Sequence, residues 1–161
     1  QPCLADELIQ PKVEGELAFC LRAPLKGPSV TIADVYNATE YVVPALEIVD
    51  SRIKDWKIKL VDTIADNGSS ARLVVGSRMT PIHQVDMRLT ELVNSGTTAE
   101  VWGNPAAAVA WLANALSAYD IELAAGSIVL AGALTAALPA KAGDSFTASF
   151  CGLGSVSVRF V

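Results

Sequence analysis

Histidine, cysteine and clusters of basic residues are scarce in this 161-residue chain, and each scarcity excludes a class of function. There is one histidine, and no CxxC or HExxH motif occurs, so we expect no zinc site. The formal net charge is −5 and Lys and Arg do not cluster, which argues against nucleic acid or an anionic membrane surface as a partner. The sparse set Cys3, Cys20 and Cys151 indicates a reducing cytoplasm, although one disulfide pair is compatible with this count.

Several motifs that carry well-known chemistry are also missing. No GxGxxG or P-loop occurs, so we infer no nucleotide site, and no GxSxG marks a nucleophile elbow. The single histidine, His83 in TPIHQVD, is either a general base or a loop residue without a chemical role. The first ten residues contain Asp6 and Glu7 and no basic start, so we expect no signal peptide.

Hydrophobic residues are abundant, at 52% of the chain against 18% charged residues. The length suits one domain, 1–161, and so apolar a composition predicts a homo-oligomer. Two uncharged runs, 103–119 and 123–140, approach the minimum length of a membrane span. Asparagine and proline interrupt the first run, and glycine, serine and proline interrupt the second, so we interpret both as elements of a soluble core rather than membrane spans.

Hydrophobic periodicity predicts both strands and helices. Residues 12–21 alternate with period two, which is typical of a strand, and the run VVPALEIV at 42–49 indicates a strand buried on both faces. We expect a short helix from the cap Thr31 to about Glu40, and an Ala-rich helix over 105–119 capped by Asn104.

The remaining segments are short. We expect strands at 71–75, 127–130, 145–150 and 155–160, a loop with a helical turn at 50–57, and a structured loop at 60–70. These elements predict an α+β domain, mainly β, closed as a sandwich or barrel.

An acidic constellation is the strongest chemical signal. Glu14 and Glu16 share one face of the first strand, and Glu47 interrupts the apolar run of the second. Taken alone, the pair fits the solvent side of an amphipathic strand. Glu47 needs a buried Lys or Arg, a raised pKa that leaves it neutral, or a metal. Three carboxylates without His or Cys would suit a hard cation such as Mg²⁺ or Mn²⁺.

Four stretches carry a resemblance to a known family: IQPKVEGELAF, ALEIVDSRIKDWKIKLVDTIADNGSS, GNPAAAVAWLANAL and GLGSVSVRF. Together they resemble the fumarylacetoacetate hydrolase superfamily, in particular its 2-oxopent-4-enoate hydratases and 4-oxalocrotonate decarboxylases. The resemblance implies a mixed β-roll or barrel with flanking helices, usually oligomeric. It also implies that Glu14, Glu16 and Glu47 bind Mg²⁺ or Mn²⁺. In that case the metal ion would compensate the charge of Glu47.

The resemblance further implies a cytoplasmic lyase of aromatic meta-cleavage catabolism that acts on a small 2-oxo or 2-hydroxydienoate acid. The favoured reaction is hydration of 2-hydroxypenta-2,4-dienoate to 4-hydroxy-2-oxopentanoate. The alternatives are decarboxylation of 2-oxohex-3-enedioate, or a non-catalytic structural role in a complex with the pathway's sister enzyme. Asp62 and Ser70 are the candidate substrate-facing residues, whereas Asp66, Asn67 and Ser69 could simply tie their loop.

Two departures from the family pattern stand out. Family members carry a further N-terminal segment with a lysine in a GxKxGLT motif, and we expect this chain to lack that segment of the native protein. They also carry a hairpin with an Asn–Gly turn, which the stretch LTELVNSGTT skips between Val93 and Asn94.

Overall fold

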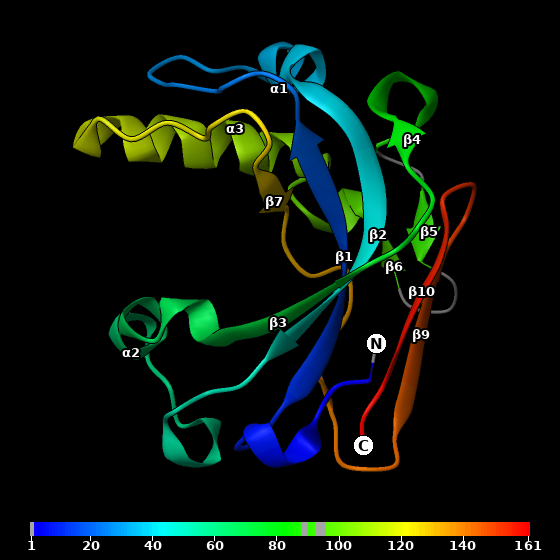
Figure 1. Cartoon of the computed structure of the whole chain (residues 1–161). Coiled ribbons are helices and arrows are strands. Elements are labelled where there is room, and N and C mark those ends of the chain that lie inside the picture. The colour runs from blue at the N-terminus through cyan, green and yellow to red at the C-terminus, as the bar shows by residue number, and fades with distance from the viewer. Residues whose placement is uncertain (1, 88–89, 93–95) are drawn as a thin grey trace.

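The computed structural model describes residues 2–87, 90–92 and 96–161. Its strands form two sheets, and the larger one is strongly curled (Figure 1). The larger sheet has the order β3-β2-β1-β7, which are β3 (Ser70–Val75), β2 (Thr39–Val49), β1 (Lys12–Leu21) and β7 (Ile128–Leu130). Two short strands extend it: β4 (Thr80–Pro81) pairs with β2, and β8 (Leu138–Pro139) pairs with β1. The smaller has the order β10-β9-β5-β6, formed by β10 (Gly154–Arg159), β9 (Ser145–Phe150), β5 (Glu91–Leu92) and β6 (Gly96–Thr97).

Helices flank these sheets. They are α1 (Ile32–Ala38), α2 (Leu60–Ala65) and α3 (Pro105–Leu116), with single 3₁₀ turns at Ala5–Glu7, Lys54–Trp56, Asn67–Ser69, Ile82–Gln84, Thr98–Glu100 and Ser117–Tyr119. The expected α+β, mainly β architecture is therefore confirmed, in the form of a curled half-barrel sheet. The skipped hairpin between Val93 and Asn94 falls outside the described residues.

The main core lies on one face of β1. Leu17 and Phe19 are fully buried there, and they belong to one cluster with Val109 of α3 and with Phe150 and Val158 of the smaller sheet. The period-two alternation of β1 thus directs its odd-numbered residues to the core, as predicted. Burial of these large side chains supplies the main stabilisation of the fold.

The other face of β1 is buried along part of its length as well. Ala18 and Cys20 pack there against Val43 and Ala45 of the antiparallel neighbour β2. The interpretation of this face as the solvent side of an amphipathic strand is therefore wrong, because Glu16, Ala18 and Cys20 on it are all buried. The prediction that 42–49 is buried on both faces is confirmed around the half-buried Glu47.

The two predicted capped helices form, with small shifts at their ends. The Asn104 side chain accepts a hydrogen bond from the Ala106 N–H (2.9 Å), and α3 ends at Leu116 before a 3₁₀ turn. The helix α1 ends at Ala38 rather than near Glu40, because Thr39 already begins β2.

The structured loop expected at 60–70 is instead largely helical, since it contains α2 and the 3₁₀ turn Asn67–Ser69. The backbone N–H of Lys59 donates to the Asp62 carboxylate (2.9 Å) at the start of α2. Leu60, Val61 and Ile64 are all exposed, so α2 has no buried stripe. Periodicity arguments assume a buried face, and this helix lacks one.

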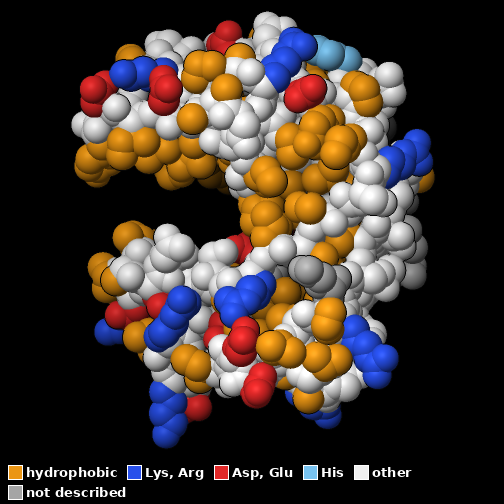
Figure 2. All heavy atoms as spheres, viewed as in Figure 1, with side chains coloured by type: hydrophobic (Ala, Val, Ile, Leu, Met, Phe, Trp, Pro, Cys, Tyr) orange, Lys and Arg blue, Asp and Glu red, His pale blue; other side chains and the backbone are white. Residues whose placement is uncertain are grey.

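A deep notch separates α3 from α2, and the curled sheet forms its inner wall (Figures 1 and 2). Hydrophobic side chains gather along the side of α3 that borders the notch (Figure 2). Within the described ranges, none of the helices has the length and apolar character needed to cross a bilayer.

Candidate metal centre

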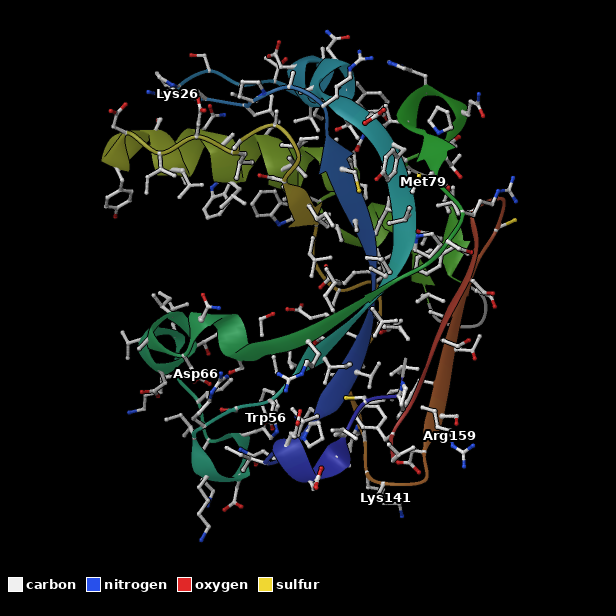
Figure 3. All side chains as sticks on the ribbon, viewed as in Figure 1. Lys26, Trp56, Asp66, Met79, Lys141 and Arg159 are labelled. Carbon is white, nitrogen blue, oxygen red and sulfur yellow. The ribbon has the colours of Figure 1, made fainter. Side chains whose placement is uncertain are left out.

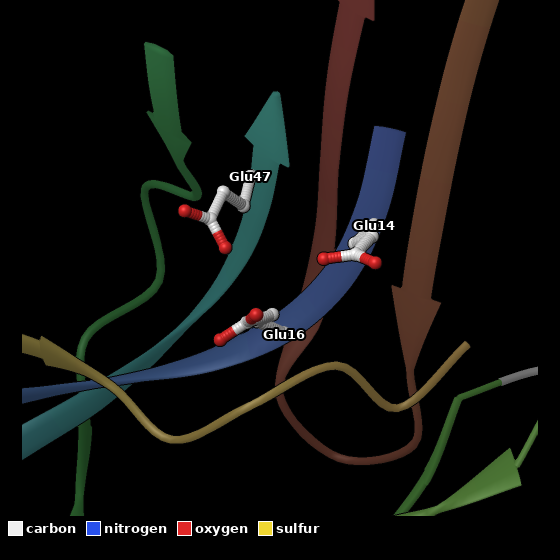
Figure 4. A group of neighbouring side chains, drawn as sticks. All are labelled: Glu14, Glu16 and Glu47. Carbon is white, nitrogen blue, oxygen red and sulfur yellow. The ribbon is translucent and has the colours of Figure 1, made fainter. Parts of the chain in front are cut away.

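Three glutamates meet on the inner face of the curled sheet (Figure 4). Glu14 and Glu16 come from β1 and Glu47 comes from β2, and one carboxylate oxygen of each lies within 4.8 Å of the others. The antiparallel register sets Glu14 directly opposite Glu47, and Glu16 follows two residues along on the same face. The structure therefore brings together all three residues that the sequence singled out as metal ligands.

A loop after β7 holds this part of β1 in place. The Gly132 N–H donates a hydrogen bond to Glu16 Oε2 (3.0 Å), and the Leu134 N–H donates to the Gly15 carbonyl (2.9 Å). The Gly15 N–H in turn donates to Thr135 Oγ1 (3.1 Å). Sequence reasoning missed Gly132, because a main-chain donor leaves no signal in the residue type.

Burial makes these carboxylates costly to ionise. Glu16 is only 3% exposed, and burial raises its pKa to about 8, assisted by the neighbouring Glu47 and Glu14 and opposed by the Gly132 N–H. Burial also raises the pKa of Glu14, with Glu47 adding to the effect and Lys12 opposing it. With a pKa of about 8, Glu16 is mostly protonated at neutral pH unless a cation is bound beside it.

The donor set fits a hard divalent cation. Like charges directly opposite one another on a sheet are destabilising, as Glu14 and Glu47 are here. Among the described residues, no ion pair within 4.0 Å involves any of the three glutamates, so a buried Lys or Arg partner is not the explanation. A cation bound by three carboxylate oxygens would neutralise the cluster, and oxygen-only ligands are those that Mg²⁺ and Mn²⁺ prefer.

The two other predicted site residues lie outside this cluster. Asp62 is half-buried in α2, and its carboxylate accepts the Lys59 N–H. Ser70 begins β3 opposite Val49, next along the sheet from the Glu47 strand.

The residues between Asp62 and Ser70 tie the loop together, as the simpler interpretation predicted. The Ser69 hydroxyl donates to Asp66 (2.8 Å), and the Arg52 N–H donates to the same carboxylate (3.1 Å). Figure 3 shows Asp66 beside α2, on the far side of the notch from α3. His83 lies on a 3₁₀ turn with its ring 5.9 Å from that of Tyr36, and it is not part of the acidic cluster.

An apolar groove adjoins the carboxylates. It is lined by Trp102, by Trp111 and Leu112 of α3, and by Leu130 and the segment that follows it, which includes Gly132. Trp102 and Trp111 make an edge-to-face contact at 5.9 Å and are nevertheless 64% and 58% exposed. Sequence reasoning missed this groove, because its walls come from segments that are distant along the chain.

Comparison with known proteins places the chain in a family. Residues 4–161 match the family described as fumarylacetoacetate (FAA) hydrolase C-terminal. A 2-hydroxyhexa-2,4-dienoate hydratase of Comamonas testosteroni is 47% identical over 161 residues, which cover 95% of this chain and 61% of the relative. A 4-oxalocrotonate decarboxylase of Pseudomonas putida is 42% identical over 163 residues, covering 96% and 62%.

A solved structure agrees closely with this fold. The 4-oxalocrotonate decarboxylase from Pseudomonas putida G7, complexed with magnesium and adipate, superposes with a TM-score of 0.91 at 39% identity. The match covers 98% of this chain and 63% of that one, so the chain spans somewhat under two thirds of the length of these relatives. The matched family, the fold and the three clustered glutamates agree, and the chain belongs to the fumarylacetoacetate hydrolase C-terminal family.

Proposed function

We propose that this chain forms the metal-binding part of a divalent-metal-dependent lyase that hydrates 2-hydroxypenta-2,4-dienoate to 4-hydroxy-2-oxopentanoate. The observation that carries the proposal is the cluster of Glu14, Glu16 and Glu47, in which Glu16 is buried and the other two are half-buried. The 47% identity to a dienoate hydratase supports hydration as the reaction.

The three glutamates would hold Mg²⁺ or Mn²⁺. When bound, such a cation supplies a Lewis acid that stabilises negative charge on the 2-oxo oxygen of the substrate. The relative complexed with magnesium, and the same relative complexed with calcium and acetate, support a divalent ion in this fold. The Gly132 N–H fixes the orientation of the Glu16 carboxylate, which keeps one oxygen directed toward the other two glutamates.

Asp62 in α2 and Ser70 at the start of β3 would contact the substrate from the edge of the sheet next to β2. Ser70 lies opposite Val49, two residues beyond Glu47, and Asp62 is held at the start of α2 by the Lys59 N–H. A carboxylate fixed in this way can orient a water molecule or accept a proton. We propose these two residues as polar groups that position the substrate and the water.

Decarboxylation of 2-oxohex-3-enedioate is the second candidate. It is supported by the 42% identity to a decarboxylase and by the fold agreement with a decarboxylase that binds the diacid adipate. Both reactions can use the same electron sink at the 2-oxo oxygen, so the metal centre alone does not separate them.

We further infer a cytoplasmic homo-oligomer. Cys3, Cys20 and Cys151 are free thiols, which fits a reducing compartment. Exposed large apolar side chains on α2, at Leu60, Val61 and Ile64, support burial of this surface in an assembly.

The test supplies Mg²⁺ and the two substrates in turn, and follows dienol absorbance and CO₂ release together. We expect the five-carbon dienoate to be consumed without CO₂ release. Prompt CO₂ from the six-carbon diacid, with the dienoate left unchanged, would establish the decarboxylase instead.

A further inference from the structure

We propose that the apolar groove beside the glutamates receives the uncharged hydrocarbon tail of the substrate and rejects a tail that ends in a second carboxylate. This inference rests on the proposed function, and it assigns to the groove the discrimination between the monocarboxylic substrate and a dicarboxylic one.

The groove begins where the acidic cluster ends. Gly132 belongs to both, because it lines the groove and its N–H donates to Glu16 Oε2. Leu130, another lining residue, lies opposite Ala18 of β1, two residues from Glu16 on the same face. A ligand whose oxo-acid end lies at the three glutamates can therefore extend its other end along this face into the groove.

The walls of the groove are built for an apolar ligand. Trp102 and Trp111 meet edge to face, and this contact favours one arrangement of the two rings. Leu112 and Ala131 complete the apolar lining. Exposed tryptophans in a concave apolar site are typical of a surface that buries a ligand, and each CH₂ group of the tail that is buried there adds to the affinity.

The charges disfavour an anionic tail. Glu100 is the charged residue in the lining, and no Lys or Arg lines the groove in the ranges that the structure describes. Lys26 pairs with Asp120 (2.6 Å), and Figure 3 shows it on the side of α3 away from the notch. A carboxylate placed in the groove would lose its hydration and would meet Glu100 without a compensating cation.

The cation on the acidic face lies at the opposite end. Lys12 is on the same face of β1 as Glu14 and Glu16, and its Nζ lies 4.2 Å from the centre of the Trp56 ring. The face thus runs from a cation at Lys12, through the three glutamates, to an apolar groove, which suits a ligand with one charged end.

The test compares two unreactive six-carbon ligands that differ only at the tail, 2-oxohexanoate and 2-oxoadipate. Each is titrated by calorimetry into the protein saturated with Mg²⁺, after a separate titration with Mg²⁺ alone. We expect 2-oxohexanoate to bind at least about tenfold more tightly. Trp111→Ala should weaken 2-oxohexanoate about tenfold, and Glu100→Lys should tighten 2-oxoadipate.

Tyr119→Ala is the matched control, because Tyr119 is an exposed aromatic residue just beyond α3 and does not line the groove. It should leave both affinities unchanged. Trp111→Phe retains an aromatic wall and should restore most of the affinity, which separates loss of the groove from misfolding.

The outcomes separate the two proposals. Equal or tighter binding of 2-oxoadipate by the unmodified protein would overturn the tail inference and leave the metal-dependent lyase standing. Normal binding of 2-oxohexanoate by Trp111→Ala would also overturn the inference. If Mg²⁺ binds but neither oxo acid does, the proposed function itself fails, and the tail inference fails with it.

Discussion

At the scale of single residues, the proposed metal centre consists of three carboxylates whose mutual proximity is unfavourable without a cation. Glu16 is the most deeply buried of them, and it accepts a hydrogen bond from the Gly132 N–H. A buried acid of this kind lowers stability when it must ionise. A cation bound beside Glu16 would offset this loss of stability, because it binds the folded state and not the unfolded state.

The raised pKa of Glu16 gives a pH dependence with a definite sign. Its pKa is about 8 in the folded protein against an ordinary value of 4.5, so the folded state holds the proton more tightly than the unfolded state. The free energy of unfolding of the metal-free protein should therefore fall as pH rises from about 5 to about 8. Urea denaturation across this range checks it.

Glu16→Gln is the control for this pH dependence, because the amide cannot titrate. The variant should show a flatter pH profile than the unmodified protein over the same range. A profile as steep in the variant as in the unmodified protein would assign the effect to other groups.

The proposed chemical role of Asp62 can be tested with a substitution that removes the charge of its side chain and keeps an acceptor oxygen. Asp62→Asn keeps an oxygen that can accept the Lys59 N–H at the start of α2, but it removes the charge. We expect the turnover rate to fall about a hundredfold, as is typical when a positioned acid or base is lost, with an unchanged melting temperature. Steady-state kinetics and thermal melting measure the two effects.

Asp66→Asn is the matched comparison, since Asp66 only ties the loop through Ser69 and Arg52. It should lower stability and leave the turnover rate close to normal. Equal losses of activity in the two variants would show that Asp62 also acts only through the loop.

At the scale of elements, α3 depends on a single side chain for its start. The Asn104 side chain accepts the Ala106 N–H, and Pro105 occupies the first helical turn. Asn104→Ala should lower the free energy of unfolding by about 1 kcal/mol. Mg²⁺ affinity should not change, because the proposed metal ligands lie on β1 and β2. Denaturation with and without Mg²⁺ tests both statements, and a weakened Mg²⁺ affinity would contradict the second.

The elements best predicted from sequence are those whose periodicity reflects burial. The alternation in β1 and the apolar run in β2 identified both strands, and Asn104–Pro105 marked the start of α3. The helix α2 escaped detection because Leu60, Val61 and Ile64 are exposed in this chain. The two-residue strands, such as β4 and β8, are too short to carry any periodic signal.

Part of the candidate site could be predicted from the sequence, and part of it could not. The three glutamates could be selected from the sequence because an acid inside an apolar strand, paired with two acids on one face of another, is chemically unusual. The Gly132 N–H and the groove at Trp102 and Trp111 could not, because both depend on how distant segments meet. Tertiary contacts of this kind leave no local pattern in the sequence.

At the scale of the whole molecule, the two faces of β1 in the curled sheet have different roles. One face of β1 builds the core with the smaller sheet, and the other face carries Glu14 and Glu16 beside Glu47 of β2 (Figure 4). Metal binding should therefore stabilise the entire fold and not only a local segment. At a hundredfold excess of Mg²⁺ over its dissociation constant, mass action predicts a gain of about 2.7 kcal/mol.

The most direct test of the three-glutamate metal centre is a calorimetric titration of Mg²⁺ into the protein and into Glu47→Gln. Glu40→Gln, a change at an exposed position of the same strand, is the matched control. We expect one binding site in the unmodified protein and in Glu40→Gln, and no measurable binding in Glu47→Gln. An unchanged Mg²⁺ affinity in Glu47→Gln would contradict the three-glutamate metal centre.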